Sequence, residues 1–278
     1  MKPKWIIEDD AFPEDIKPLT EALEKQNIEH KVIPHLSPFK LDEWEEHLGN
    51  YPGEECVIFY GSLNTAKQLR KITKWIPGVY YNIPKYECVN YYAHLGEYLL
   101  NRNYILLPFG ELKNQKEFLY HCLAMDRAIF IRPNRGDKIF TGKLVYKEKF
   151  EEEIERFGYG NIGSEELVAA SEPKNLKFEW RFVVVEGKVI TGSQYAENDR
   201  FGTEVGCPLE AFEFAEEIAA HYNPDVAWVI DVCQTKGGTY RLMEVGCFSC
   251  AGLYKCDLDL IVKAVSVAAV REWQSYND

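Results

Sequence analysis

The 278-residue sequence lacks several features that define whole classes of protein. It has no apolar run of about 20 residues, the length that a membrane-spanning helix needs. Its first ten residues, MKPKWIIEDD, do not have the pattern of a secretory signal, so we expect a cytoplasmic protein without a membrane partner. Basic residues are in the minority, with 32 Lys and Arg against 44 Asp and Glu. The net charge of −12 argues against nucleic acid as a partner, because phosphate contacts need a basic face.

The sequence also lacks the cysteine spacing of a disulfide framework. Its eight cysteines are scattered, and free thiols in a reducing compartment are the default expectation. Cys247 and Cys250 form a CxxC motif, but a zinc site needs a second pair, for which Cys233 and Cys256 are only loose candidates. A redox motif is disfavoured because a strand, and not a thioredoxin-type helix, is expected around the pair.

The first 90 residues alternate between strand and helix signals, which predicts a small α/β domain with a parallel, doubly wound sheet. Its expected strands are Lys4–Ile7, His30–Pro34 and Cys56–Tyr60, and its expected helices are Pro13–Gln26 and a helix from Gly61-Ser62 through Lys74. Residues 37–53 are expected to form a loop with one short helix.

The carboxyl ends of these strands should form the ligand edge of the sheet, near Asp9, His35 and Gly61. Gly61–Asn64 offers a helix N-terminus that could bind an anion. An N-cap at Ser62 explains the same residues equally well.

From Tyr86 onward the pattern is mixed, and residues 91–278 are expected to form a second, α+β domain. The expected helices are Asn90–Asn101, Lys113–Met125, Lys147–Phe157, residues 209–221, and a buried final helix from Leu258 to Val270 that Asp257 caps.

A basic loop lies between two expected strands of this part. One strand ends at Arg132-Pro133, a turn holds Gly136-Asp137, and the next strand covers Ile139–Val145. Four cations lie within twelve residues: Arg132, Arg135, Lys138 and Lys143. The loop could close over a polyphosphate through its backbone N–H groups. A solvated basic hairpin tip is an equally good interpretation.

A hairpin is expected at Lys177–Tyr195, with its turn at Glu186-Gly187. Lys177, Glu179 and Arg181 alternate along its first strand and therefore project from one face. A half-buried strand face normally carries apolar side chains, so this triplet indicates a binding face. The alternative is the solvent face of an edge strand.

A second hairpin is expected between Trp228 and Tyr254, with Gly237-Gly238 as a two-residue loop. That loop would place Asp231 directly opposite Glu244, and like charges at this position repel. A divalent cation would relieve the repulsion, and Mg²⁺ typically binds one or two carboxylates together with phosphate oxygens. We therefore expect a Mg-nucleotide site, and expect that removing either charge leaves the metal-free protein at least as stable. A shifted register, or two solvated acids, is the alternative.

Five elements, taken in chain order, resemble those of the ATP-grasp superfamily. They are the basic strand end with its glycine loop, the strand ending at Glu172-Pro173, the FEWRFVVVEGKVI hairpin, VIDV and LMEVG. The sequence looks most like the phage and bacterial clade named for one arginine and two lysines. The resemblance covers about residues 90–270 and implies an ATP-grasp fold of two α+β subdomains with the nucleotide site between them. The smaller α/β domain would precede it.

The resemblance also implies roles for individual residues, with ATP and Mg²⁺ as cofactors. Arg132 and Arg181 would be the catalytic cations, Arg132 at the nucleotide phosphates and Arg181 near the γ-phosphate or the acyl phosphate. Asp231 and Glu244 match the metal ligands. The remaining nucleotide-binding positions would be Lys138 and Lys143 in the loop, the hinge Ala170, Ser171 and Glu172 at the adenine edge, Glu179 at the ribose, and Lys177 beside it on the same face.

The implied activity is ATP-dependent ligation of a small-molecule or peptide carboxylate to an amine through an acyl phosphate. Arg181→Ala should then leave folding nearly intact while it lowers turnover. One residue departs from the family pattern, because Gly246 stands where an asparagine usually completes a second metal site. A nucleotide-binding module without catalysis is therefore one alternative. A phosphotransferase that uses the same site without ligation is the other. The sequence names neither the substrates nor the oligomeric state.

Overall fold

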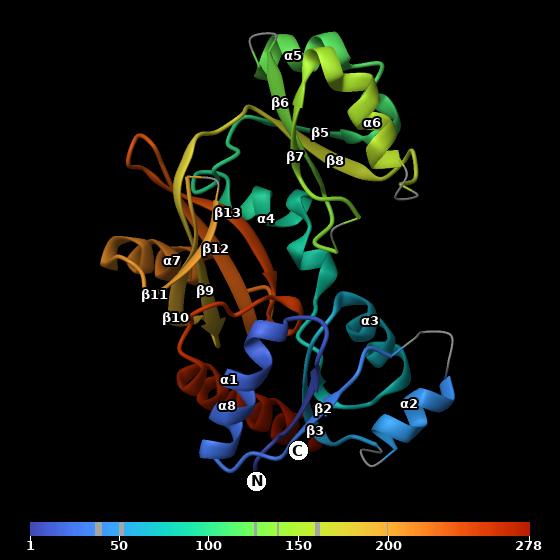
Figure 1. Cartoon of the computed structure of the whole chain (residues 1–278), viewed down its shortest axis with the longest axis vertical. Coiled ribbons are helices and arrows are strands. Elements are labelled where there is room, and N and C mark those ends of the chain that lie inside the picture. Colours follow the sequence, from blue (N-terminus) through green and yellow to red (C-terminus); the bar gives the residue numbers. More distant parts are fainter. Residues whose placement is uncertain (37–40, 50–52, 125–126, 138, 159–161, 199) are drawn as a thin grey trace. The chain divides into compact units, whose positions relative to one another are not determined.

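The computed structural model describes residues 1–36, 41–49, 53–124, 127–137, 139–158, 162–198 and 200–278. The chain divides into two compact units. The first unit comprises Met1–Asn82, Phe178–Val232 and Glu244–Asp278, and the second comprises Ile83–Lys177 and Cys233–Met243. Mixed α/β structure is present throughout, as the sequence predicts (Figure 1). No described helix is both long enough and apolar enough to cross a membrane.

The first unit contains the predicted parallel sheet near the amino terminus, with strand order β2-β1-β3-β4. Its strands are β1 (Lys4–Glu8), β2 (His30–Ile33), β3 (Cys56–Tyr60) and β4 (Ile76–Gly78), and its helices are α1 (Pro13–Lys25), α2 (Leu41–Leu48) and α3 (Leu63–Ile72). Every residue of β3 is buried, as its apolar sequence CVIFY predicts. The predicted strand–helix alternation is confirmed, and α2 lies in the segment where one short helix was expected.

A five-stranded antiparallel sheet carries the two predicted hairpins, in the order β11-β10-β9-β12-β13. Its strands are β9 (Leu176–Val185), β10 (Lys188–Glu197), β11 (Arg200–Val205), β12 (Ala227–Thr235) and β13 (Tyr240–Cys247). Glu186 and Gly187 form the predicted two-residue turn, and both have positive φ values, 50° and 74°. Because β9 lies inside the sheet, the edge-strand interpretation of the Lys177–Arg181 segment is wrong.

Two helices follow strands of this sheet, α7 (Leu209–His221) and α8 (Leu258–Asn277). Asp257 caps α8 as predicted, because its side chain accepts a hydrogen bond from the Leu260 backbone at 3.0 Å. Helix α8 lies beside α1 (Figure 1), and both contribute to one apolar core with β1, β3, β9 and β12. The expectation of a fully buried α8 is wrong, since Leu260 and Val267 are each 46% exposed. The helix buries one face only.

The second unit contains an antiparallel sheet with strand order β5-β8-β6-β7. Its strands are β5 (Tyr104–Pro108), β6 (Ala128–Pro133), β7 (Lys143–Tyr146) and β8 (Leu167–Ser171), with helices α4 (Cys88–Leu95), α5 (Lys116–Leu123) and α6 (Phe150–Gly158). Helix α4 ends six residues earlier than predicted. Strand β7 begins four residues later than predicted, and Gly142, the residue before it, lies close against β6. A Cβ on Gly142 would lie 2.7 Å from Phe130 Cζ.

Candidate functional site

A buried ion pair joins Arg181 on β9 to Asp231 on the neighbouring strand β12. Arg181 is 8% exposed and Asp231 is 6% exposed. Arg181 Nε donates to Asp231 Oδ1 at 2.8 Å, and Nη2 donates to Oδ2 at 2.7 Å. This bidentate geometry is the strong form of the arginine–carboxylate interaction. Two of the sequence-predicted site residues therefore lie together in the first unit, in direct contact with each other.

Burial and pairing act on the arginine in opposite directions. Burial alone lowers the pKa of Arg181, but the Asp231 carboxylate raises it, and the result is a pKa well above the ordinary value. The Arg181 guanidinium is therefore charged at neutral pH. Removing one partner would leave a buried charge without compensation, which is costly. This geometry reverses two expectations from the sequence, that neutralising Asp231 is harmless to stability and that Arg181→Ala leaves folding nearly intact.

The β12–β13 loop differs from the predicted two-residue turn. The Thr235 N–H donates to Thr239 O at 2.9 Å, and the Gly238 N–H donates to Thr235 O at 2.9 Å. Only Gly238 has a positive φ, at +84°. These features define a three-residue loop, Lys236–Gly238, ending in a left-handed glycine. The loop is therefore one residue longer than predicted, and the placement of Asp231 opposite Glu244 stays a prediction.

Glu244 and Gly246 lie on β13, the strand next to β12. Glu244 is half-buried, and Gly246 has no left-handed backbone conformation. A Cβ on Gly246 would lie 3.2 Å from Val229 Cγ2, which is a tight contact. The described residues contain no cluster of three His, Cys, Asp or Glu side chains that could hold a metal. Asp231 and Glu244 therefore offer two carboxylates at most, a set that suits one Mg²⁺ with water or phosphate as its other ligands.

Two tyrosines that the sequence did not identify as site residues cover Arg181. The guanidinium Cζ lies 5.0 Å from the ring centroid of Tyr254 and 5.8 Å from that of Tyr195. The two rings stack with centroids 5.1 Å apart. Glu179 hydrogen-bonds Tyr195, whose pKa is raised well above its ordinary value by burial, by Asp231 and by Glu179. Glu179 and Arg181 thus share one cluster, as the strand alternation predicts.

The segment that carries Tyr254 is fixed by hydrogen bonds from several elements. Arg181 Nη1 donates to Gly252 O at 3.0 Å, and the Asp15 carboxylate accepts from the Leu253 N–H at 2.8 Å. The Tyr60 hydroxyl donates to Asp15 at 2.6 Å. Burial raises the pKa of Asp15 above its ordinary value. Tyr254 itself has a φ of +53°, a left-handed conformation that is uncommon for a residue other than glycine.

A buried carboxylate occupies the predicted ligand edge of the parallel sheet. Glu8, at the end of β1, is fully buried and accepts from the Ser62 N–H at 2.6 Å and from Thr65 Oγ1 at 2.9 Å. The predicted anion position at the N-terminus of α3 is therefore filled by the chain's own Glu8. A Cβ on Gly61 would lie 2.6 Å from Glu8 Cβ, so glycine is required there. His35 Nδ1 lies 2.6 Å from Glu8 Oε1, while the His35 side chain is 46% exposed.

The second unit brings the predicted phosphate arginine close to the predicted hinge. Arg132 on β6 lies opposite Ala169 on β8, one residue before Ala170 and Ser171. Its Nη1 donates to Met243 O at 3.3 Å. Ser171 Oγ is buried and has no hydrogen-bond partner among the described residues. An unpaired buried hydroxyl is costly, and its position at the end of β8 fits a ligand that offers a hydrogen bond there.

The other predicted nucleotide residues are engaged in different ways. Lys143 is paired with Glu153 at 2.6 Å, and this lysine lowers the pKa of Glu153. Glu172 accepts from Asn103 Nδ2 at 2.8 Å and also pairs with Lys174. Lys177 is exposed at the start of β9. Lys138 lies outside the described residues.

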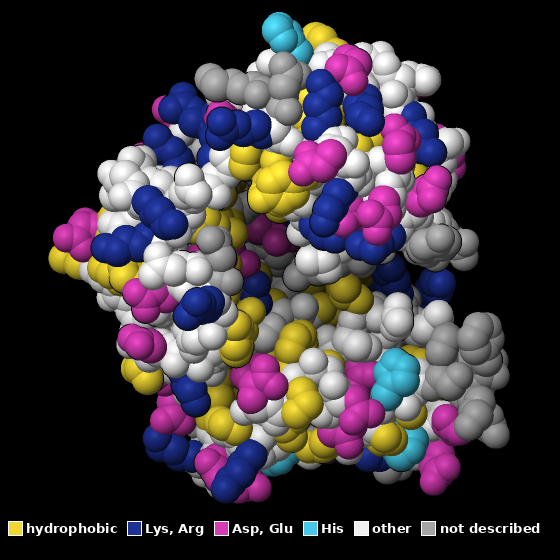
Figure 2. Space-filling model, turned by 45° about the horizontal axis from the view of Figure 1, so that its top comes forward, with side chains coloured by type: hydrophobic (Ala, Val, Ile, Leu, Met, Phe, Trp, Pro, Cys, Tyr) yellow, Lys and Arg dark blue, Asp and Glu magenta, His cyan; other side chains and the backbone are white. Residues whose placement is uncertain are grey.

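Arg135, the fourth cation of the basic loop, contacts two acids, Asp137 at 2.7 Å and Glu166 at 3.3 Å. Like Lys143, Arg135 is therefore paired with acidic side chains in this structure. Figure 2 shows Lys and Arg side chains interspersed with Asp and Glu over the face that it displays.

The fold defines the class of protein. Solved structures with the same fold include the D-cycloserine synthetase DcsG, at 14% identity and a TM-score of 0.62, which covers 96% of this chain and 99% of its own. The D-alanine–D-alanine ligase of Bacillus anthracis complexed with ATP is similar at 14% identity and a TM-score of 0.62, with 99% of both chains covered. The ATP-grasp ligase PsnB, complexed with a minimal precursor, has 14% identity and a TM-score of 0.56 over 97% of this chain and 100% of its own.

These likenesses show the ATP-grasp fold. The family is identified independently from the sequence, since residues 101–264 match the ATP-grasp domain of R2K clade family 2, and this chain belongs to that family. No curated protein sequence matches the chain.

Proposed function

We propose that this protein is an ATP- and Mg²⁺-dependent ligase that joins a carboxylate to an amine through an acyl phosphate. The observation that carries the proposal is the buried Arg181–Asp231 pair in a chain of the ATP-grasp family. A folded protein rarely retains a buried ion pair for stability alone, because apolar residues serve that purpose at least as well. A fixed guanidinium beside a carboxylate is well suited to phosphoryl transfer, in which charge develops on phosphate oxygens.

In the proposed reaction, a carboxylate oxygen attacks the γ-phosphorus of ATP, the bond from that phosphorus to the bridging oxygen breaks, and ADP leaves. The amine then attacks the acyl carbon, the C–O bond breaks, and phosphate departs with one oxygen of the original carboxylate. Arg181 would balance negative charge on the transferred group. Asp231 and Glu244 would hold Mg²⁺, which when bound neutralises phosphate charge. Each Asp231 oxygen keeps a lone pair beyond the one that Arg181 engages.

In the second unit, we propose that the nucleotide is held by Arg132, Lys143 and the hinge Ala170–Glu172, with Lys138 as a further candidate. The Ser171 hydroxyl supports this assignment. It has no hydrogen-bond partner in the part of the chain that the structure describes, and a bound base or ribose would supply one. Lys177 and Glu179 follow along β9. Lys143 would have to exchange Glu153 for phosphate.

We propose that the amine loses its proton to His35. Glu8 accepts hydrogen bonds from Ser62 and Thr65 and lies against Nδ1 of His35, an arrangement in which Nδ1–H donates to the carboxylate and Nε2 keeps its lone pair. The Gly61 N–H donates to Ser249 O at 2.8 Å, while Arg181 contacts Gly252, three residues further on. The Glu8–His35 pair and the Arg181 guanidinium thus lie on either side of the loop Ser249–Gly252 in the first unit. Glu8 would be a positioning residue.

The amine and the carboxylate are proposed to be small molecules or peptide groups. The similar structures include a D-cycloserine synthetase, a D-alanine–D-alanine ligase and a ligase bound to a precursor, so both kinds of substrate occur on this fold. A second candidate function is nucleotide binding without ligation. Gly246 favours it, because glycine has no oxygen on its side chain to complete a second metal site.

A hydroxylamine trap distinguishes these functions. The protein is incubated with ATP, Mg²⁺, hydroxylamine and a panel of amino acids and short peptides, and both ADP and hydroxamate are measured. The ligase proposal predicts hydroxamate with at least one carboxylate, in amounts equal to ADP, and none when EDTA replaces Mg²⁺. A phosphotransferase would release ADP and form a phosphorylated product without hydroxamate. Stabilisation by Mg-ATP with no ADP release for any carboxylate would favour the binding module.

A further inference from the structure

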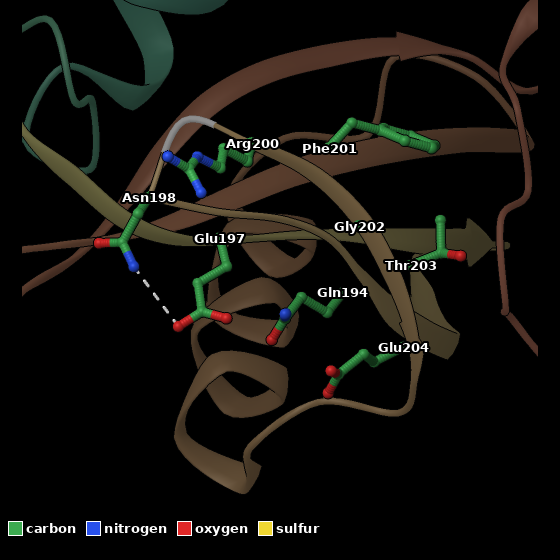
Figure 3. A pocket seen from close by; sticks show the side chains of 8 residues that line it. All are labelled: Gln194, Glu197, Asn198, Arg200, Phe201, Gly202, Thr203 and Glu204. Atoms are coloured by element: carbon green, nitrogen blue, oxygen red, sulfur yellow. Dashed lines mark hydrogen bonds between the residues drawn. The ribbon is translucent and has the colours of Figure 1, made fainter.

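Strand β11 (Arg200–Val205) forms an open edge of the five-stranded sheet. It pairs with β10 on one side, and no described strand pairs with its other side. Two of its apolar side chains are largely exposed, Phe201 at 72% and Val205 at 85%, although the Phe201 ring also lies 5.9 Å from that of Tyr254 between centroids. Figure 3 shows side chains of β10 and β11 around a hollow of about 600 Å³ at this edge of the sheet. An open edge with exposed apolar side chains is a template for pairing with another strand.

The two charged side chains of β11 lie on one face of the sheet. Alternation along the strand puts Arg200, Gly202 and Glu204 on one face and Phe201, Thr203 and Val205 on the other. Both charged residues line the hollow in Figure 3. Neither Arg200 nor Glu204 forms an ion pair with a described residue. The edge therefore presents one positive and one negative side chain, four residues apart, that are available to a partner.

This pattern is complementary to itself. When two copies of β11 run antiparallel with Gly202 opposite Gly202, Arg200 of each copy lies opposite Glu204 of the other. The same register sets Phe201 opposite Thr203 on the other face, and the twofold axis makes each contact occur twice. Directly opposed residues of unlike charge attract in an antiparallel pair. A shift by two residues in either direction loses both charge pairs, so the charges select a single register.

We propose that β11 pairs with β11 of a second copy of this chain, so that two five-stranded sheets join edge to edge in a homodimer. The net charge of −12 on each chain opposes association at long range, but at physiological salt such repulsion is screened beyond about 8 Å. The matched Arg200–Glu204 contacts act at much shorter distance. The inference does not depend on the proposed function, because it is argued from the strand edge and its charges alone.

The test is sedimentation equilibrium of the full chain from 1 to 100 µM at 0.15 M salt, with charge-reversal variants. The wild type should be dimeric. Arg200→Glu and Glu204→Arg should each place like charges opposite each other and raise the dimer dissociation constant at least tenfold. An equimolar mixture of these two variants should dimerise, because every opposed pair is then of unlike charge. The double variant should likewise recover the dimer. Lys17→Glu, an exposed charge reversal on α1, is the matched control and should remain dimeric.

A wild type that stays monomeric at 100 µM would overturn the proposal. Single variants that dimerise as tightly as wild type would place the interface elsewhere and also overturn it. A mixture that stays monomeric would show that Arg200 and Glu204 do not oppose each other. Circular dichroism of each variant establishes that it is folded, which is expected because both side chains are exposed.

Discussion

Neutralising Asp231 should destabilise the protein in the absence of nucleotide and metal. In Asp231→Asn the Arg181 guanidinium stays buried, with an amide in place of the carboxylate that accepts two hydrogen bonds at 2.7 and 2.8 Å. Breaking a buried pair by removing one partner costs about 3–5 kcal/mol. The expected loss lies toward the lower end of that range, because the amide oxygen of asparagine still accepts one bond.

The expected change in melting temperature follows from the size of the chain. Unfolding entropy of about 2.1 cal/mol/K per residue gives about 0.6 kcal/mol/K for 278 residues, so 3–5 kcal/mol corresponds to a decrease of about 5–9 °C. Differential scanning calorimetry of wild type, Asp231→Asn, Arg181→Met and the double variant measures this value and the coupling energy. The double variant should lose less than the two single variants together, because it leaves no isolated buried charge.

An exposed ion pair provides the control. Arg271 and Glu186 lie 2.6 Å apart, but their side chains are 63% and 42% exposed. Arg271→Gln should therefore change stability by no more than about 1 kcal/mol. If Asp231→Asn melts at the wild-type temperature, the buried pair is not formed in the metal-free protein, and the reasoning from Arg181 fails.

Three further predictions concern Asp15, Gly246 and His35. Burial raises the folded-state pKa of Asp15, so its carboxyl ionises at lower pH in the unfolded chain than in the folded one. The stability of the wild type relative to Asp15→Asn should therefore fall as pH rises from 4 toward 7, and a stability difference that does not change with pH would contradict this. Gly246→Asn should strengthen the Mg²⁺ dependence of ATP binding measured by calorimetry, whereas Gly246→Ala, which adds the same contact to Val229 without an amide, should not. The same Mg²⁺ dependence of ATP binding in both variants would refute the second-metal explanation. His35→Gln should lower the rate of amide formation with an ammonium acceptor by about 10²-fold or more. It should leave the rate of hydroxamate formation nearly unchanged, because hydroxylamine is already unprotonated at neutral pH, and equal losses with both acceptors would exclude His35 as the base.

Local structure was predictable from the sequence where a short segment determines it. Glu186-Gly187 forms the expected turn, Asp257 caps α8 as expected, and CVIFY is a fully buried strand. The alternation of Glu179 and Arg181 correctly placed both side chains in one cluster around Tyr195, because side-chain direction along a strand follows residue spacing. The family match supports the ATP-grasp assignment made from five ordered elements.

Pairing between distant segments was not predictable in the same way. Gly237 and Gly238 both permit positive φ, so the sequence does not distinguish a two-residue loop from a three-residue loop. The contact between Arg181 and Asp231 requires β9 to lie next to β12, which is a property of sheet order. The Glu8 side chain was missed because it belongs to an acidic run typical of a solvated loop, although its strand buries it.

The central claim is tested most directly by oxygen transfer from the carboxylate to phosphate. The carboxylate that the hydroxylamine trap identifies is labelled with ¹⁸O in both oxygens and incubated with ATP, Mg²⁺ and an amine acceptor, and the released phosphate is analysed by mass spectrometry. An acyl phosphate intermediate predicts one ¹⁸O in each phosphate released, in equal amount to the amide formed. Amide formation with unlabelled phosphate would contradict the proposed mechanism.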